Sequence, residues 1–236
     1  MLNELLNQPF SGFSKEALKF LKSLSNPLNN NKAWFDNNRI RYDEFLKFPM
    51  RNLIDDLAVE LKKIDSDIVV NYKSIFRINR DIRFSKDKTP YKNYYSAAFA
   101  FDKIKSSEVP QFYFHFSKDE FLFAAGQYST DNDYAKKIRL GIAENYSEYI
   151  KIVSEKNFKK NFGIVQGISL SRIPKGFEKY IDKNKPMLTE FLKKKQFYVY
   201  KTFDVNDVLN SKMKNDIISG INITYDFTRF LHLSTK

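Results

Sequence analysis

The sequence predicts an α+β fold, in which a central antiparallel sheet is packed by N-terminal and C-terminal helices. Apolar residues recur at helical spacing before about residue 64 and again in the last third, but alternate with polar residues from about residue 68 to 125. The breaks between the strand candidates are short, as in an antiparallel meander. An apolar share of 42% over 236 residues, with few Gly and Pro, indicates a globular chain.

The N-terminal part predicts three helices. The first has apolar residues at helical spacing from Phe13 to Leu24 and ends before Pro27. Asn residues at 29–31 are candidate caps for a second helix, which carries Trp34, Phe35 and Tyr42. The third begins near Pro49 and continues to about residue 63.

The middle of the chain predicts strands at 75–85, 94–101, 111–116 and 121–125, with breaks at 102–110 and 117–120. After them we expect a long helix that is capped by Asp131 or Asp133 and continues to Ile150. Short strands near 162–168 and 197–202, a helix after Pro186 and a final helix from about residue 204 complete the chain. We expect a single domain over 1–236, with a smaller C-terminal lobe from about residue 157 as the alternative.

Composition limits the classes of function. The chain has no cysteine, which excludes disulfides, thiolate catalysis and cysteine-ligated zinc. No secretory signal or membrane span is predicted, so a cytoplasmic location is the default expectation. Of the net charge of +12, residues 151–236 carry +9, which suits a polyanion such as nucleic acid or reflects lysines spread over solvated faces.

Arginine is concentrated in one segment. Lysine outnumbers arginine 31 to 9, yet Arg77, Arg80 and Arg83 fall within seven positions, interleaved with aspartate. Arginine can hold a carboxylate or a phosphate with two parallel hydrogen bonds, whereas lysine is a point charge. The segment is therefore the candidate functional site.

A strand over 75–85 would separate the side chains of this segment onto two faces. Arg80 would share a face with Phe84 and other apolar residues, where it needs a partner such as Asp87, or a β-bulge that re-aims it. The opposite face would present Arg77, Asn79, Asp81 and Arg83, joined by Gln111, Tyr113 and His115 of a neighbouring strand. Such a face can bind an anion, or the charges can form an ion-pair network that ties the strand to the turn at 86–91.

The segment matches the pattern R-x-x-R-D-x-R-F-x-x-x-[DN]-K-x-x-Y at Arg77, Arg80, Asp81, Arg83, Phe84, Asp87, Lys88 and Tyr91. This pattern resembles that of the mainly bacterial family called domain of unknown function 2461. Residues 30–35 with Tyr42 and Pro49, 125–128 with Arg139, and 172–177 are also similar to the family, whereas the stretch at 180–186 is longer before its proline. The family has no established activity, so the resemblance implies membership and no mechanism.

Three functions are compatible with the residues. In the leading hypothesis Arg77, Arg83, Lys86 and Lys88 bind the phosphates of a ligand, nucleic acid among the candidates. Tyr91, Tyr94 and Tyr95 then stack on bases, or else they only pack against neighbouring strands. In the second, a phosphoryl-transfer or hydrolytic enzyme uses Asp81 as base or nucleophile, Arg77 and Arg83 to stabilise developing negative charge, and His115 as general acid. The alternative for His115 is an ordinary half-buried residue with a backbone partner. Asp81, Asp87 and His115 carry side chains that can ligate a metal, but they lack a recognised spacing such as H-E-x-x-H, so no metal is predicted. In the third, Arg80, Asp87 and Phe84 hold the fold together or serve a partner. No cofactor or oligomeric state is predicted.

Overall fold

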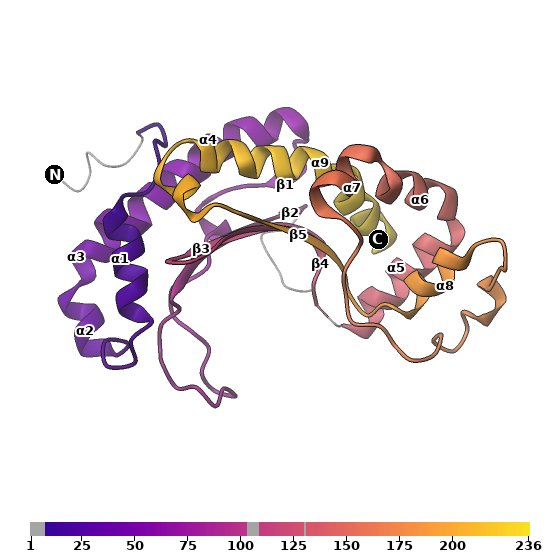
Figure 1. Cartoon of the computed structure of the whole chain (residues 1–236), viewed down its shortest axis with the longest axis horizontal. Helices are drawn as coiled ribbons and strands as arrows, with labels where there is room; N and C mark the ends of the chain where they lie inside the picture. Colours follow the sequence, from indigo (N-terminus) through magenta and orange to yellow (C-terminus); the bar gives the residue numbers. More distant parts are fainter. Residues whose placement is uncertain (1–7, 103–108, 130) are drawn as a thin grey trace. The chain divides into compact units, whose positions relative to one another are not determined.

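A five-stranded antiparallel sheet with helices before, between and after its strands forms the centre of the computed structural model, which confirms the α+β class (Figure 1). The structure describes residues 8–102, 109–129 and 131–236. Two expectations therefore concern residues outside the described part: the first seven residues, where a secretory signal was not expected, and most of the break at 102–110. In the described part of the chain no helix is both long and apolar enough to span a bilayer.

The chain divides into two compact units. Unit 1 comprises Met1–Phe99, Tyr113–Phe123 and Thr202–Ser219, and unit 2 comprises Ala100–Phe112, Ala124–Lys201 and Gly220–Lys236. The lobe boundary that the sequence suggested near residue 157 lies inside unit 2, and the domain organisation stays a prediction.

Unit 1 begins with the expected helices, which are α1 (Lys15–Leu24), α2 (Lys32–Asn37), α3 (Arg39–Tyr42), a π-helical turn (Asp43–Lys47) and α4 (Phe48–Ile64). The side chain of Asn31 caps α2 by accepting from the Trp34 N–H at 2.9 Å. Buried Asn30 lies beside it and donates to the carbonyls of Leu24 and Tyr91, while its own oxygen accepts from the Tyr91 N–H. One amide thus joins the end of α1 to the start of the sheet.

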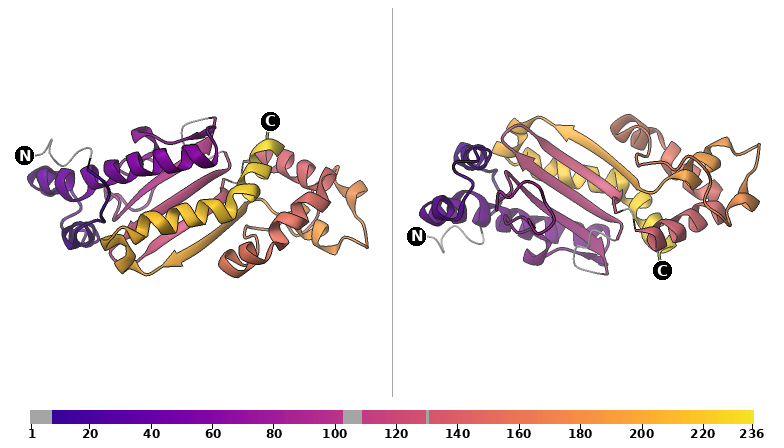
Figure 2. Two further views of the ribbon diagram at one scale, coloured as in Figure 1. Left: turned by 90° about the horizontal axis from the view of Figure 1, so that it is seen from above. Right: turned by 90° about the horizontal axis from the view of Figure 1, so that it is seen from below.

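The sheet has the order β1-β2-β3-β4-β5, formed by β1 (Ile68–Val69), β2 (Tyr94–Phe101), β3 (Gln111–Ser117), β4 (Phe121–Gln127) and β5 (Phe197–Phe203). Alternation along β3 buries Phe112, Phe114 and Phe116 and leaves Tyr113 and His115 half-exposed on the other face. Figure 2 shows α4 and α9 (Lys212–Ser234) in front of the strands from one side, and the strands without a helix in front from the other.

Unit 2 departs from the sequence prediction in two places. The expected long helix is two helices, α5 (Asn132–Glu144) and α6 (Tyr146–Ser154), because Asn145 leaves helical geometry and its amide donates to the Gly141 carbonyl. The prediction of a strand near 162–168 is wrong. Helix α7 (Lys156–Phe162) occupies the beginning of this range, and Gln166 forms an isolated bridge to Tyr198. The helix after Pro186 is present as α8 (Pro186–Lys193).

Candidate functional site

The arginine segment forms a loop, residues 76–92, which we call the motif loop. Its two ends run antiparallel: the Arg80 N–H donates to the Pro90 carbonyl, and the Lys92 N–H donates to the Ile78 carbonyl, each at 2.8 Å. Asn79 and Tyr91 form an isolated bridge between them. The strand predicted over 75–85 is therefore wrong. Proline has no N–H, so Pro90 cannot return a hydrogen bond, and the ladder stops there.

Arg80 organises the middle of the motif loop. Its Nη1 donates to an oxygen of Asp87, the partner expected from the sequence, and at 2.6 Å to the Thr89 hydroxyl. Asp87 also accepts from the Thr89 N–H and hydroxyl at 2.9 and 2.8 Å. The Arg80 guanidinium and these Thr89 donors hold the pKa of the Asp87 carboxyl at about 2, below its ordinary value of 3.8. This network ties the two arms of the loop together.

Asp81 is held by Arg83. The Arg83 Nε lies 3.0 Å from Oδ1 and its Nη2 lies 2.6 Å from Oδ2, and the Arg83 N–H also donates to Oδ1. These contacts with the Arg83 side chain and backbone lower the pKa of Asp81 from 3.8 to about 2. A carboxylate with such a pKa is a poor general base at neutral pH.

Phe84 lies where the sequence did not place it. A strand would have put its ring on the buried face with Ile78, but the ring is 94% exposed, because the chain turns after Ile82 and the alternation ends. The Arg83 guanidinium carbon lies 5.9 Å from the centre of this ring. Phe84, predicted as structural, is instead an apolar surface presented to solvent beside a cation.

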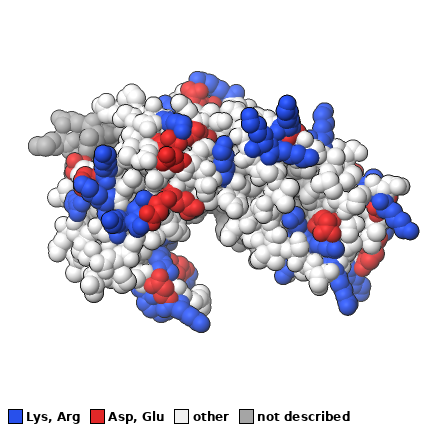
Figure 3. Space-filling model, viewed as in Figure 1, with Lys and Arg blue, Asp and Glu red and all other residues white. Residues whose placement is uncertain are grey.

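The remaining cations of the motif loop differ in what they contact. Arg77 and Lys86 are exposed, and neither side chain makes a hydrogen bond or ion pair with a described residue. Lys88 donates to the Ile82 carbonyl at 3.0 Å. Lys92 donates to the Arg77 carbonyl, and burial and the charge of Arg77 lower the pKa of Lys92. Figure 3 shows basic and acidic side chains next to one another on this loop, at the lower left of the view.

Tyr91 is buried rather than open to a ligand. Its ring stacks on Phe35, with ring centres 4.1 Å apart and an angle of 12° between the planes. Tyr95 is also buried, and its hydroxyl lies 3.3 Å from that of Tyr42. Neither ring has a free face on which a base could stack.

His115 packs among aromatic rings on the sheet. Tyr94 and Tyr113 lie against it at 5.4 and 5.6 Å between ring centres, and its Nε2 lies 2.9 Å from the Glu120 carboxylate. Its Nδ1 is buried and has no hydrogen-bond partner among residues 8–102, 109–129 and 131–236. No contact joins His115 to Asp81 in the described residues, and no group of three His, Asp or Glu side chains there could hold a metal. Sequence reasoning missed Glu120, whose position across the β3–β4 turn is the only signal for it.

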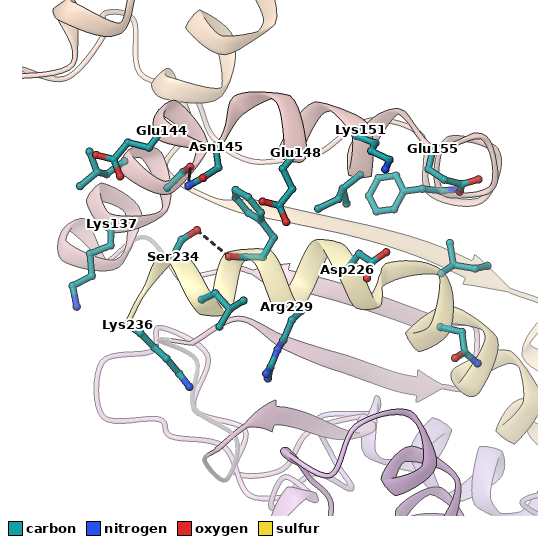
Figure 4. Close-up of a pocket in the computed structure, with 18 of the residues that line it drawn as sticks. Lys137, Glu144, Asn145, Glu148, Lys151, Glu155, Asp226, Arg229, Ser234 and Lys236 are labelled. Carbon is teal, nitrogen blue, oxygen red and sulfur yellow. Dashed lines mark hydrogen bonds between the residues drawn. The ribbon is translucent and has the colours of Figure 1, made fainter.

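A groove of about 1020 Å³ lies in unit 2 between α9 and helices α5 to α7 (Figure 4). No residue of the motif loop lines it. Four acidic and four basic side chains line it: Glu144, Glu148, Glu155 and Asp226, and Lys137, Lys151, Arg229 and Lys236. Because the two signs balance, the groove favours neither anions nor cations.

A family model described as "Conserved hypothetical protein (DUF2461)" matches residues 16–230, a range that includes the whole motif loop. Searches of curated proteins and of solved structures found no match.

Proposed function

We propose that this chain, which belongs to the DUF2461 family, binds a phosphate-bearing ligand through the motif loop, and that the ligand is single-stranded nucleic acid. The observation that carries the proposal is the exposed ring of Phe84 beside Arg83, on a loop with six basic residues and two aspartates. Proteins that bind single strands without sequence preference combine positive charge along the backbone with aromatic rings that stack on bases.

The exposure of Phe84 supports a binding role. Burying a phenylalanine side chain stabilises a fold by about 1.5–3 kcal/mol, and this loop forgoes that contribution. A base stacked on the ring would cover its apolar surface. Arg77 and Lys86 are then available for phosphates, and Arg83 keeps N–H groups beyond those that bind Asp81.

The ion pairs of the motif loop support a preorganised site. Arg80 and Asp87 have the structural role in this proposal. Their network with Thr89 fixes the arms of the loop that carry the Phe84 ring, Arg77 and Lys86. A loop that is already ordered loses less conformational entropy when a ligand binds.

The enzyme alternative receives no support from this geometry. Asp81 is exposed, held by Arg83 and has a pKa of about 2, so it does not accept protons near neutral pH. His115 has its Nδ1 buried and its Nε2 on Glu120.

Fluorescence anisotropy with a labelled 12-nucleotide single strand at low salt tests the proposal. We expect Phe84→Ala to weaken binding by about fivefold or more, which is the loss in affinity expected when one base no longer stacks on an aromatic ring. Phe84→Trp keeps an aromatic ring and should retain the affinity. Arg77→Ala weakens binding to every sequence alike. Leu28→Ala, which removes another highly exposed apolar side chain elsewhere in unit 1, leaves it unchanged. Equal affinity of the wild type and Phe84→Ala, or no binding by the wild type, refutes the proposal.

A further inference from the structure

We propose that unit 2 carries a second base-stacking surface for single-stranded nucleic acid, formed by Tyr128, Tyr198 and Tyr200, which we call the tyrosine platform. The inference rests on the proposed function for the class of ligand, but on different residues. None of the three belongs to the motif loop, and none lines the groove of Figure 4.

The three rings form a continuous row. Tyr128 and Tyr198 have ring centres 5.1 Å apart, and Tyr198 and Tyr200 have centres 6.4 Å apart, with 31° between the latter planes. Tyr128 is 65% exposed and Tyr200 is 48% exposed. Rings that contact one another while keeping outer faces in solvent offer π-surfaces to successive bases.

Strand alternation and a close backbone approach bring these rings together. Alternation along β5 places Tyr198 and Tyr200 on one face and buries Val199 on the other. Gly126 has φ +111°, and a Cβ there would lie 2.2 Å from the Phe197 carbonyl oxygen. This close approach, with a hydrogen bond from the Gln196 amide to the Tyr128 carbonyl, sets Tyr128 beside β5.

Exposed apolar side chains lie on the segment that runs beside β5. The Gln166 N–H donates to the Tyr198 carbonyl at 2.7 Å, so residues 164–168 run beside the strand. Ile164 and Ile168 on this segment are 74% and 59% exposed. Phenol burial, together with the nearby Tyr128 and Tyr200, raises the pKa of Tyr198, in keeping with the packed row.

The net charge of unit 2 favours a polyanion as the occupant. Unit 2 holds 20 of the 40 Lys and Arg residues but only 11 of the 28 Asp and Glu, so it carries +9 of the net charge of +12. An apolar patch alone suits a protein partner equally well. A row of tyrosines on a strongly basic unit matches single-stranded nucleic acid, whose bases offer free faces, better than duplex, whose bases are already stacked.

Photo-crosslinking with peptide mapping tests the platform directly. The probes are a thymidine tetranucleotide carrying one 5-iododeoxyuridine and an abasic tetranucleotide with the same phosphates. We expect crosslinks on peptides that contain Tyr128, Tyr198 or Tyr200. In Tyr200→Ala, crosslinking at these peptides falls at least about fivefold, while Tyr200→Phe retains it. Met187→Ala, an exposed apolar change elsewhere in unit 2, is the matched control.

The outcomes separate this inference from the proposed function. Crosslinks at Phe84 but none at the three tyrosines overturn the platform and leave the motif loop standing. Crosslinks at the tyrosines but none at Phe84 support the platform and overturn the role of the motif loop. If Tyr200→Ala weakens binding of the abasic and thymidine probes equally, the tyrosine does not stack on bases, and the platform is refuted.

Discussion

Each aspartate of the motif loop holds a different arginine. Asp87 joins Arg80 to Thr89 across the loop, whereas the hydrogen bonds of Asp81 to described residues all come from Arg83, two residues away. The first pair therefore connects the two arms, and the second only orients one side chain. Both carboxylates are solvent-exposed, although the Arg80 guanidinium is partly buried, so each pair adds to local order more than to global stability.

We predict that the two aspartates differ in their effect on loop order. Asp87→Ala removes the acceptor for Arg80 and Thr89, so the amides of Arg80 and Lys92, which donate across the loop, exchange with solvent several-fold faster. Asp81→Ala, the matched control, leaves those amides protected. Hydrogen exchange followed by NMR gives the comparison, and equal exchange in the two variants contradicts the assigned roles.

The carboxyl titrations provide a second prediction. Asp81 and Asp87 have pKa values lowered to about 2 in the folded chain, so their ion pairs are present above about pH 4 and are lost as the pH falls through about 2. Titration of the carboxyl ¹³C shifts should give midpoints near 2 for both groups. A midpoint near 4 for either residue shows that its arginine does not hold it in solution.

At the residue level, the pairing of Arg80 with Asp87 was predictable, because a partly buried guanidinium needs a partner and the turn returns Asp87 toward it. The exposure of Phe84 was not. Period-two alternation assigns a face only while the strand continues, and Pro90 ends the pairing before residue 84 can take part.

At the scale of elements, local signals predicted most helices and all three long central strands. Strand β2 matches its predicted range, and the Asn and Asp caps of α2 and α5 are in place. The failures are breaks: Asn145 divides a helix, and within residues 162–168 only Gln166 forms a bridge. The first break depends on the hydrogen bond of one asparagine side chain, and the second region has Gly163 and Gly167 at positive φ; apolar periodicity encodes neither feature.

Asn30 provides a prediction about the junction of elements. Asn30→Ala leaves the buried N–H and carbonyl of Tyr91 without partners, so we expect a loss of about 1–3 kcal/mol in the free energy of unfolding. Neighbouring Asn29, whose side chain has no hydrogen bond to a described residue, is the matched control. Urea unfolding that gives the same loss for Asn29→Ala and Asn30→Ala contradicts the account.

Gly126 provides a similar prediction for unit 2. Gly126→Ala and Gly176→Ala both place a side chain at positive φ, but only the Cβ at 126 would clash, with the Phe197 carbonyl and the Phe227 ring. We expect Gly126→Ala to be less stable than Gly176→Ala by about 1–3 kcal/mol in urea unfolding. Equal stability means that β4 and β5 separate easily, which would also weaken the argument for the tyrosine platform.

At the scale of the whole molecule, the division into two units and the tyrosine platform lay beyond sequence reasoning. Tyr128 and Tyr198 are far apart in the chain, and only the pairing of β4 with β5 brings them together. The basic C-terminal third was visible in the sequence, but charge alone does not say which surface uses it.

The stability of the chain should respond to pH through His232. Burial lowers the pKa of His232 below 6.5, although the Asp102 carboxylate 3.1 Å away raises it, and Lys236 and Arg229 lower it further. The unfolded chain therefore binds this proton more readily, and stability falls as the pH drops below about 6.5. Between pH 7.5 and 5.5, urea unfolding should show a smaller loss in His232→Gln than in the wild type; equal losses contradict this.

The salt dependence of single-strand binding tests the central claim most directly. If Arg77, Arg83 and Lys86 each contact a phosphate, the logarithm of the affinity falls against the logarithm of the salt concentration with a slope of about −2 or steeper, since each contact on a single strand contributes about −0.7. Arg77→Ala should make the slope shallower by about 0.7, whereas Lys22→Ala on α1 should leave it unchanged. Binding that is independent of salt, or a slope that Arg77→Ala does not change, contradicts the account.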